Sequence, residues 1–555
     1  MAMNFNESFD RLGVVRSIRD GIIGQDHMIG GPYGPKKVVY ADWVASSRAV
    51  GFLEDYIRDE VLPVYSNTHT TSSTMGHQVS LFREEARMII ARTINARDDK
   101  DALIFTGSGA TAAVNHLVRA MRLNVGAQVV APENRPVVFV GPHEHHSNIL
   151  PWRESICEVV NIPENRESGL IDLEVLEAKL KEFAKRPLLI GAFSAASNIT
   201  GILQDVASVN RVLHKHNALA FWDYAAAAPY VKVDMNPMAS NEEDRGLVHC
   251  DAMFISPHKF PGGVCTPGIL VAKKVLFDRR LPPCNPGGGT VDFVTDEDQL
   301  YLSKIHEREE SGTPDIIGCI RAGLVFQLKH AVTAELIEQL EANLYAKAVK
   351  KLAKNPRIHL MGPLTKTTSG SSSTTRVNRL PTLSFVIYHQ SGKLLHYNFI
   401  CALLDNLFGI QSRGGCVCAG PYGEYLLGMD IDLARLYQEQ LNKFDDVEVL
   451  RPGFIRLSLN YFISEQEADY VLDAIDFVAR EGWKLLHEYS FQPETNEWMH
   501  LSNKSLPNRK WLGEVTYTTG KMVYPKTSIS AKRTTADLPA QFQEAKATVE
   551  KAVRQ

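Results

Sequence analysis

The stretch DAMFISPHKFPGGVCTPG, residues 251–268, joins a short apolar run to a lysine and a glycine-rich turn. The run, residues 252–256, is apolar at both odd and even positions, which is typical of a strand buried on both faces of a parallel sheet. Lys259 follows this strand, and ligands bind beyond the carboxyl ends of strands in such sheets. Burial beside cationic groups lowers the pKa of a lysine and frees its amine for Schiff-base chemistry. The motif therefore makes Lys259 a candidate Schiff-base lysine, although many surface lysines follow strands too.

Four similar apolar runs precede this stretch, at residues 103–105, 136–141, 187–193 and 218–223. The segments between them have helical periodicity. In one of them a single face collects four apolar side chains, those of Leu173, Leu176, Leu180 and Phe183. Alternating strands and helices predict an α/β fold, with a mostly parallel sheet flanked by helices on both faces.

A smaller α+β unit is predicted after a long helical stretch at about 317–355. Its strands are expected at 381–389 and 453–462, with a helix at 398–408 between them. Its last helix begins with the capping box of Ser464 and Glu467. We expect four regions: an N-terminal segment at 1–39, a cofactor-binding large domain at 40–316, a small domain with its linker helix at 317–490, and a basic extension at 491–555.

Composition, charge and the length of the apolar runs argue against several classes of protein. The chain has 555 residues, of which 44% are hydrophobic and 22% charged, which excludes a long disordered chain. The formal charge of −4 gives no reason to expect a nucleic-acid partner, although residues 501–555 alone carry +6 and end in an amphipathic segment. No apolar run is long enough for a membrane helix, and the first residues lack the apolar core of a secretion signal. Eight cysteines form no disulfide framework, so we expect a cytoplasmic protein without a membrane partner, with an organelle as the alternative location.

Two further strand ends carry chemically suggestive residues. Asp223 ends the run at 218–223, where an unpaired carboxylate is costly to bury. A pyridinium nitrogen would pair with it, and a helix N-cap is the alternative role. The loop GSGAT, residues 107–111, opens a helix whose free N–H groups, with Thr111, can cradle a phosphate. It has no following Lys-Ser or Lys-Thr, which argues against a nucleotide P-loop.

Three histidines, His143, His145 and His146, follow the run at 136–141. They have no HExxH or carboxylate spacing of a metal centre, so no metal is expected. An imidazole stacked on a flat cofactor ring suits the same position.

These motifs occur in an order that resembles one family. Lys259 in SPHK, Asp223, Thr111 in SGAT, Asn198 in SNITG and the segment EHHSNILPW (144–152) are similar to the fold-type-I pyridoxal-phosphate enzymes of aminotransferase class V. Within that class the chain looks most like cysteine desulfurases and selenocysteine lyases. The resemblance runs from about residue 40 to about residue 485.

The resemblance implies a role for each matching residue. Lys259 would bind the aldehyde of pyridoxal 5′-phosphate, Asp223 would pair with its ring nitrogen, and His145 would stack on the ring and assist proton transfer. Asn198 would bond the phenolic oxygen or the substrate carboxylate. Ala110, Thr111, Ser256 and His258 would hold the phosphate, joined by Thr313 from a neighbouring subunit, which implies a homodimer. Arg456 would grip the substrate α-carboxylate, a bidentate task suited to guanidinium, with Arg413 and His69 as further substrate-binding residues.

The segment GIQSRGGCVCAGPYG, residues 409–423, bears on the reaction. In the resembling group an arginine is followed five positions later by the nucleophilic cysteine and an alanine, which Arg413, Cys418 and Ala419 match. Cys416 is an additional cysteine. A metal fragment or a buried structural thiol is the alternative for this pair, but the glycines and the arginine favour an exposed, electropositive loop in which a thiolate is stabilised.

The chain departs from the family pattern at Ala226, where a glutamine usually bonds the phenolic oxygen of the cofactor. The main hypothesis is a C–S (or C–Se) lyase that acts on cysteine or a close analogue, releases alanine and keeps a persulfide on Cys418. A sulfur-acceptor protein would be its further partner. The alternatives are an aminotransferase, epimerase or β-lyase that uses Lys259 without Cys418, and a non-catalytic scaffold.

Overall fold

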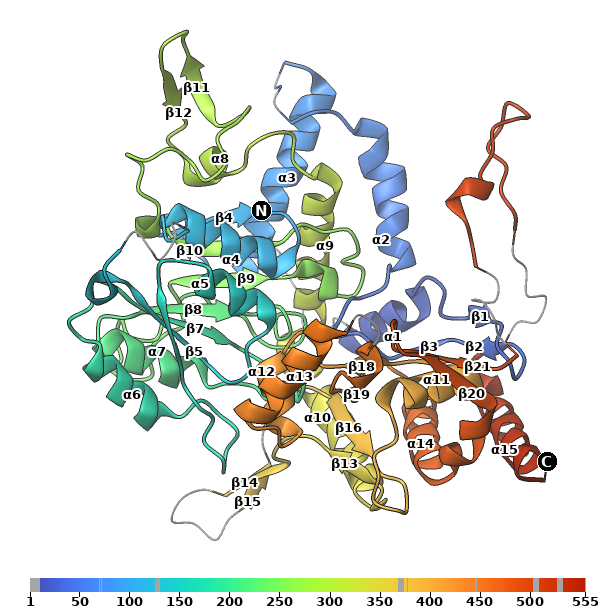
Figure 1. Cartoon of the computed structure of the whole chain (residues 1–555). Coiled ribbons are helices and arrows are strands. Elements are labelled where there is room, and N and C mark those ends of the chain that lie inside the picture. Colours follow the sequence, from blue (N-terminus) through green and yellow to red (C-terminus); the bar gives the residue numbers. More distant parts are fainter. Residues whose placement is uncertain are drawn as a thin grey trace.

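The structure is a computed structural model of the whole chain (Figure 1). It describes residues 10–68, 70, 72–124, 130–367, 374–376, 378–444, 447–502, 509–526 and 533–554.

A seven-stranded sheet forms the centre of the larger part (Figure 1). Its order is β4-β10-β9-β8-β7-β5-β6, and four of its six pairings are parallel. β10 is antiparallel to both of its neighbours. All five predicted runs are strands, whereas β6 and β10 were not predicted. The bounds are β4 Asp101–Phe105, β5 Val137–Val140, β6 Glu158–Asn161, β7 Leu189–Ser194, β8 Leu219–Asp223, β9 Ala252–Ile255 and β10 Ile269–Lys273.

Helices cover both faces of this sheet. Alternate residues of each strand enter two separate apolar clusters, so that Phe139 and Trp222 pack on one face and Val138 and Phe221 on the other. The predicted face of α6 (Leu173–Glu182) is confirmed, since Leu176 and Leu180 are fully buried. The mostly parallel α/β prediction is therefore confirmed. The other helices of this part are α2 Gly51–Tyr56, α3 Thr74–Thr93, α4 Gly109–Ala120, α5 Leu150–Arg153, α7 Val206–Lys215, α8 Ile305–Glu309 and α9 Ile316–Val332.

The predicted long helix at 317–355 is two helices. α9 and α10 (Ala334–Leu352) meet at an angle of 73°. Thr333 separates them with a left-handed φ of 77° and accepts the Leu336 N–H at its side chain, which caps α10.

The smaller part has a four-stranded antiparallel sheet in the order β13-β16-β19-β18. The predicted strands, the helix between them and the capping box of Ser464 and Glu467 are all present. The bounds are β13 Ile358–Leu360, β16 Thr382–Ile387, β18 Arg413–Gly415, β19 Phe454–Ser458, α11 Tyr397–Phe408, α12 Gly420–Leu426, α13 Ile431–Lys443 and α14 Glu465–Glu481.

Segments near both ends of the described chain contact this smaller part, although the helix at Arg11–Gly21 buries Val15 and Ile18 in an apolar cluster of the larger part. Near the N-terminus, β3 (Val39–Tyr40) pairs with β17 (Ile410–Gln411), after α1 (Arg11–Gly21) and the pair β1 (Met28–Ile29) and β2 (Lys36–Lys37). The predicted C-terminal amphipathic helix is confirmed as α15 (Leu538–Arg554), whose fully buried Gln541 bonds β2, α11 and α14. The remaining pairs are β11 Val291–Val294 with β12 Gln299–Tyr301, β14 Thr365–Thr367 with β15 Thr374–Arg376, and β20 Tyr489–Gln492 with β21 Glu497–His500.

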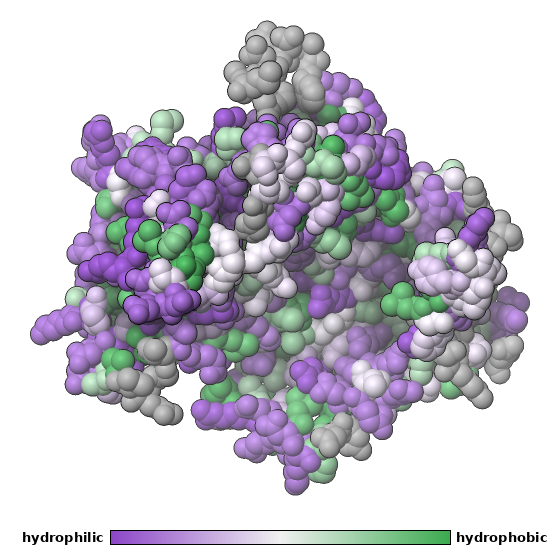
Figure 2. Space-filling model, turned by 90° about the horizontal axis from the view of Figure 1, so that it is seen from above, coloured by the Kyte–Doolittle hydropathy of each residue, from purple (hydrophilic) through white to green (hydrophobic). Residues whose placement is uncertain are grey.

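Apolar side chains are exposed on α2, α3 and the β11–β12 hairpin, which form the upper part of the molecule in Figure 1. Seen from above, this face is largely hydrophilic but has several apolar patches (Figure 2). The exposed residues on these elements include Phe52, Tyr56, Met75, Leu81, Met88, Phe293, Val294 and Leu300. Among the helices in the described ranges, no single one is long and apolar enough to cross a bilayer; α9 and α10 pass such a test only as a bent pair.

Candidate active site

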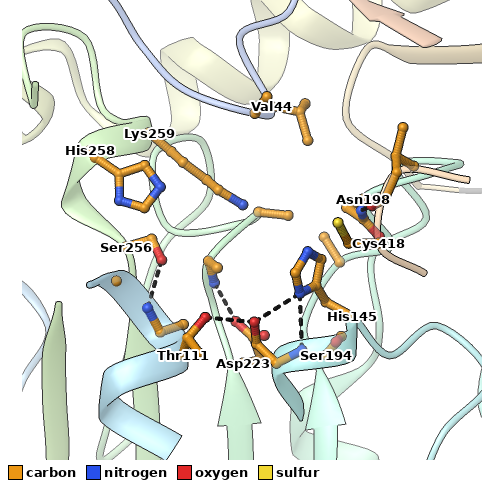
Figure 3. A pocket seen from close by; sticks show the side chains of 18 of the residues that line it. Val44, Thr111, His145, Ser194, Asn198, Asp223, Ser256, His258, Lys259 and Cys418 are labelled. Atoms are coloured by element: carbon orange, nitrogen blue, oxygen red, sulfur yellow. Dashed lines mark hydrogen bonds between the residues drawn. The ribbon is translucent and has the colours of Figure 1, made fainter. Parts of the chain in front are cut away.

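A cavity lies beyond the carboxyl ends of β7, β8 and β9, between the two parts of the chain (Figure 3). This is the edge where open α/β sheets bind ligands. Eleven of the predicted site residues line the cavity: Ala110, Thr111, His145, Asn198, Asp223, Ser256, His258, Lys259, Arg413, Cys418 and Arg456. The structure thus gathers residues that are more than 340 positions apart in the sequence.

Lys259 and Asp223 come from neighbouring strands. Lys259 ends a short 3-10 helix, Pro257–Lys259, directly after β9, and Asp223 ends β8. Burial lowers the pKa of Lys259 to about 8, and although Asp223 raises it, Arg456 and Arg413 lower it further. Burial also raises the pKa of Asp223, against the effect of the Ala225 N–H bound at 2.8 Å and the charge of Lys259. The site therefore holds an amine that is partly unprotonated near neutral pH beside a desolvated carboxyl.

The first turn of α4 forms a cradle with the end of β9. The Ala110 N–H donates to Ser256 Oγ at 2.8 Å, and Ser108 at the N-cap makes no side-chain bond to the helix. Gly109 has φ of +57°, and a Cβ built on it would lie 2.8 Å from Ser256 Oγ and 2.9 Å from the His258 ring. Only glycine fits this close approach, and a helix N-terminus without a side-chain cap favours a bound anion.

His145 is held as a neutral ring. The Ser147 N–H donates to His145 Nδ1 at 3.1 Å, which places the remaining ring proton on Nε2. Burial, and then the charge of Lys259, lower the pKa of His145 to about 3. For the same two reasons the pKa of His258 falls to about 4. Both imidazoles are uncharged at neutral pH.

Two arginines form the other wall of the cavity. Arg456 on β19 donates from Nη2 to Asp42 Oδ1 at 2.7 Å and from Nη1 to the Asn198 carbonyl at 3.1 Å. Arg413 on β18 is its direct cross-strand partner. Like charges opposite each other destabilise a sheet. A bound carboxylate would offset the repulsion between these two positive charges at the cavity.

Cys418 is exposed and lines the cavity, whereas Cys416 is half-buried and is not among the lining residues. Cys418 and the preceding Val417 both have left-handed φ values, 58° and 46°. Such values are uncommon for residues other than glycine and are a genuine outlier for a β-branched residue.

The lining polar atoms fit pyridoxal phosphate. Within the described part of the chain, three residues that line the cavity have a buried polar atom without a hydrogen-bond partner: Asn198 Oδ1, Arg456 Nε and His143 Nε2, the last of which lies 3.4 Å from Glu164 Oε2. Buried polar atoms are rarely left unpaired, so a polar ligand is the expected partner. The amine of Lys259, the carboxyl of Asp223 and the open cradle of α4 match the aldehyde, ring nitrogen and phosphate of this cofactor.

One predicted residue that the structure describes, Thr313, does not line the cavity. Thr313 is exposed between α8 and α9, where its Oγ1 accepts a bond from Asn67 at 3.5 Å, and a role toward a second subunit stays a prediction. His69 lies outside the described residues. Sequence reasoning missed Asp42 and Ser147 as partners of Arg456 and His145, since no spacing rule connects Asp42 to an arginine 414 positions later. Ala226 does line the cavity, so this position offers no side-chain donor.

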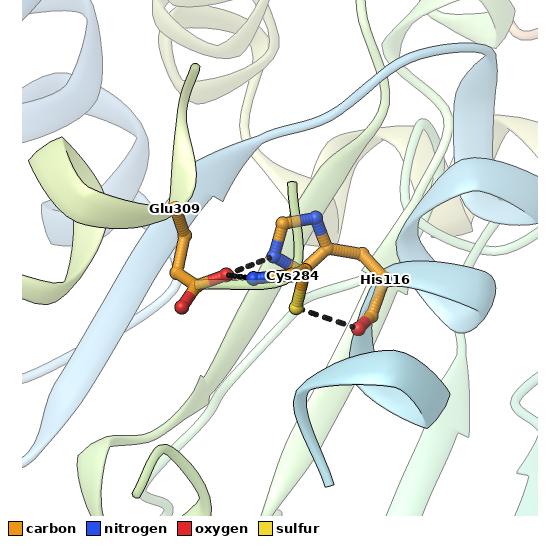
Figure 4. A group of neighbouring side chains, drawn as sticks. All are labelled: His116, Cys284 and Glu309. Carbon is orange, nitrogen blue, oxygen red and sulfur yellow. Dashed lines mark hydrogen bonds and ion pairs between the residues drawn. The ribbon is translucent and has the colours of Figure 1, made fainter. Parts of the chain in front are cut away.

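A cluster of potential metal ligands, His116, Cys284 and Glu309, lies outside this cavity (Figure 4). His116 Nε2 is 3.1 Å from Glu309 Oε2, and the same oxygen accepts the Cys284 N–H at 3.0 Å. Cys284 Sγ lies 3.5 Å from the His116 carbonyl. Protein partners therefore satisfy these side chains, which brace α4 against α8.

Comparisons with known proteins agree with this site. Residues 39–471 match the family model for aminotransferase class-V. A probable cysteine desulfurase of Halalkalibacterium halodurans is 28% identical over 425 residues, covering 75% of this chain and 92% of the relative. A cysteine desulfurase of Escherichia coli is 28% identical over 399 residues, covering 70% and 86%.

Solved structures confirm the fold. The crystal structure of a cysteine desulfurase from Escherichia coli superposes with a TM-score of 0.63 at 20% identity, covering 86% of this chain and 99% of that one. An apo cysteine desulfurase from Thermococcus onnurineus gives 0.62 at 23% identity, covering 80% and 95%. The predicted fold-type-I architecture is thereby confirmed. With a family model matched over most of its length, the chain belongs to the aminotransferase class V family.

Proposed function

We propose that this protein is a pyridoxal-phosphate-dependent cysteine desulfurase, a C–S (or C–Se) lyase that releases alanine from cysteine or its selenium analogue. The observation that carries the proposal is the presence of a cysteine, Cys418, in the same cavity as Lys259, Asp223 and Arg456. Other chemistry at this type of site needs the lysine and the carboxyl but has no use for an exposed thiol.

The residues of the cavity have separate roles in substrate binding and proton transfer. Arg456, oriented by Asp42, binds the substrate carboxylate with Arg413 beside it, which directs the substrate sulfur into the cavity. When bound, pyridoxal phosphate supplies the electron sink for the carbon that loses its proton. Asp223 holds the proton of the ring nitrogen. Lys259, with its lowered pKa, removes the Cα proton as a general base.

Cys418 then acts as the nucleophile. Its thiolate attacks the substrate sulfur, so that an S–S bond forms, the C–S bond breaks and the electron pair passes to the substrate carbon chain. That chain takes up one proton at the former C–S carbon and one at Cα, the latter returned by Lys259, and leaves as alanine, while a persulfide remains on Cys418. The thiol of Cys418 and cysteine are thus converted into the persulfide and alanine with no external oxidant or reductant. The neutral His145 can carry protons between the ring and the substrate.

The test compares single cysteine variants of the holoenzyme. Alanine release from cysteine should be nearly abolished in Cys418→Ser and retained in the matched control Cys416→Ser. Sulfur bound to the enzyme should be found on the peptide with Cys418. If Cys418→Ser released alanine as fast as the wild type, the enzyme would instead be a β-lyase or aminotransferase of the same family.

We further infer a homodimer, a sulfur-acceptor protein and a cytoplasmic location. The exposed apolar side chains of α2, α3 and the β11–β12 hairpin support a subunit interface, and the exposed Thr313 is available to a second subunit. A persulfide on the exposed Cys418 could be passed to an incoming thiol. All eight cysteines are free thiols in the described structure, which suits a reducing compartment.

A further inference from the structure

The turn that carries Cys418 is conformationally strained. The Ala419 N–H donates to the Cys416 carbonyl at 3.1 Å and closes a turn whose two central residues, Val417 and Cys418, both have positive φ. A turn of this type normally requires glycine, asparagine or aspartate at these positions. Strained turns persist only where the surrounding structure holds them, and they concentrate at functional sites.

Two residues of the larger part hold this turn through three hydrogen bonds. Asn198 Nδ2 donates to the Val417 carbonyl at 2.8 Å. The His146 N–H donates to the Cys418 carbonyl at 2.8 Å, and the Gly420 N–H donates to His146 Nε2 at 3.0 Å. His146 therefore bonds both the residue that carries the thiol and the residue two positions after it.

The bond to Gly420 also caps α12. Ala419 is the N-cap residue of this helix and has no side chain that could accept from its first turn. The imidazole of His146 supplies that acceptor from another part of the fold. A Cβ on Gly420 would lie 3.2 Å from His146 Nε2, so the close approach favours glycine at this position.

We propose that His146 is a positioning residue for Cys418: its backbone N–H and its imidazole Nε2 together hold the strained turn that presents the thiol to the cavity. The proposal rests on the proposed function for its catalytic consequence, but the holding of the turn is independent of it. His146 itself is not among the cavity-lining residues, so it acts through Cys418.

The imidazole must be neutral to accept a bond at Nε2. The groups around it are Arg153 on α5, the adjacent His145, Glu424 on α12 and Cys418 on the turn. Burial, and then the charge of Arg153, lower the pKa of His146 below its ordinary value. The acceptor is therefore available at neutral pH.

The experiment uses the holoenzyme with two variants. His146→Leu removes the acceptor, whereas His146→Gln keeps an amide oxygen that can reach the Gly420 N–H. Amide hydrogen exchange is measured on peptides covering residues 416–426, with peptides from β7 and β8 as internal controls for folding. Cysteine-dependent alanine release is measured on the same samples.

We expect about tenfold faster exchange at 416–426 in His146→Leu and near wild-type exchange in His146→Gln. The kcat for alanine release should fall about 2- to 10-fold in the leucine variant, the range of a lost hydrogen bond, with KM unchanged, and should recover in the glutamine variant.

Unchanged exchange in His146→Leu would overturn the proposal, as would equal effects of both substitutions, which would indicate ring packing. Faster exchange with unchanged kcat would show that the turn is held for another reason than catalysis and would also overturn it. If the wild type itself released no alanine, the proposed function would fail, while the exchange data would still decide whether His146 holds the turn.

Discussion

Gly109→Ala tests the phosphate cradle most sharply, because the structure gives both the strain and the clash. Alanine at φ of +57° costs about 1–2 kcal/mol relative to an unstrained backbone. Its Cβ would lie 2.8 Å from Ser256 Oγ, which must move and weaken the bond from the Ala110 N–H, a loss of about 1 kcal/mol. The free energy of unfolding of the apoenzyme should therefore fall by about 2–3 kcal/mol.

Cofactor binding should be weakened more than the fold, since the new methyl group would press on Ser256 and His258, the residues that we expect to hold the phosphate. Urea unfolding of the apoenzyme gives the stability change, and titration with pyridoxal phosphate, followed by its absorbance, gives the affinity. Gly107→Ala is the matched control in the same loop, because its Cβ would meet nothing nearer than Ala112 Cβ at 3.4 Å. Wild-type affinity in Gly109→Ala, or an equal loss in both variants, would refute the assignment.

Three other predictions follow from the same geometry. The rate at which the apoenzyme binds pyridoxal phosphate, measured by stopped-flow absorbance, should rise with pH around a midpoint near 8, because the amine of Lys259 reacts only when unprotonated. A midpoint near the ordinary lysine value of about 10.4 would contradict this. Asp42→Asn should raise the KM for cysteine about 3- to 10-fold by loosening Arg456, with a smaller effect on kcat in steady-state assays; an unchanged KM would exclude Asp42 as its orienting partner. Gln541→Ala should lower the free energy of unfolding by about 2–4 kcal/mol, because it leaves buried partners on three elements unpaired. The control Gln543→Ala, at an exposed position of the same helix, should change urea unfolding little. Equal effects of the two substitutions would mean that α15 is not held by Gln541.

The parallel strands could be predicted because their burial on both faces leaves an uninterrupted apolar run, as in residues 218–223. β10 is just as apolar, but its sequence does not tell that it inserts antiparallel between β9 and β4. That choice is made by tertiary pairing. The break between α9 and α10 was missed for a related reason: Thr333 adopts a positive φ that its residue type disfavours, and the surrounding packing holds it there.

The cavity was anticipated where a motif marks a strand end, as for Lys259, Asp223 and the loop before α4. Residues that position other side chains of the site were not anticipated. Asp42 contacts Arg456 and His146 contacts the Cys418 turn, and sequence spacing carries no information on such long-range contacts.

The central claim is that the amine of Lys259 binds the aldehyde of pyridoxal phosphate. Borohydride reduction of the purified holoenzyme fixes this bond, and peptide mass mapping then locates the label. We predict one pyridoxyl group per chain, on the peptide that contains Lys259, and none in Lys259→Ala. A label on another lysine, or none in a protein saturated with the cofactor, would contradict the claim.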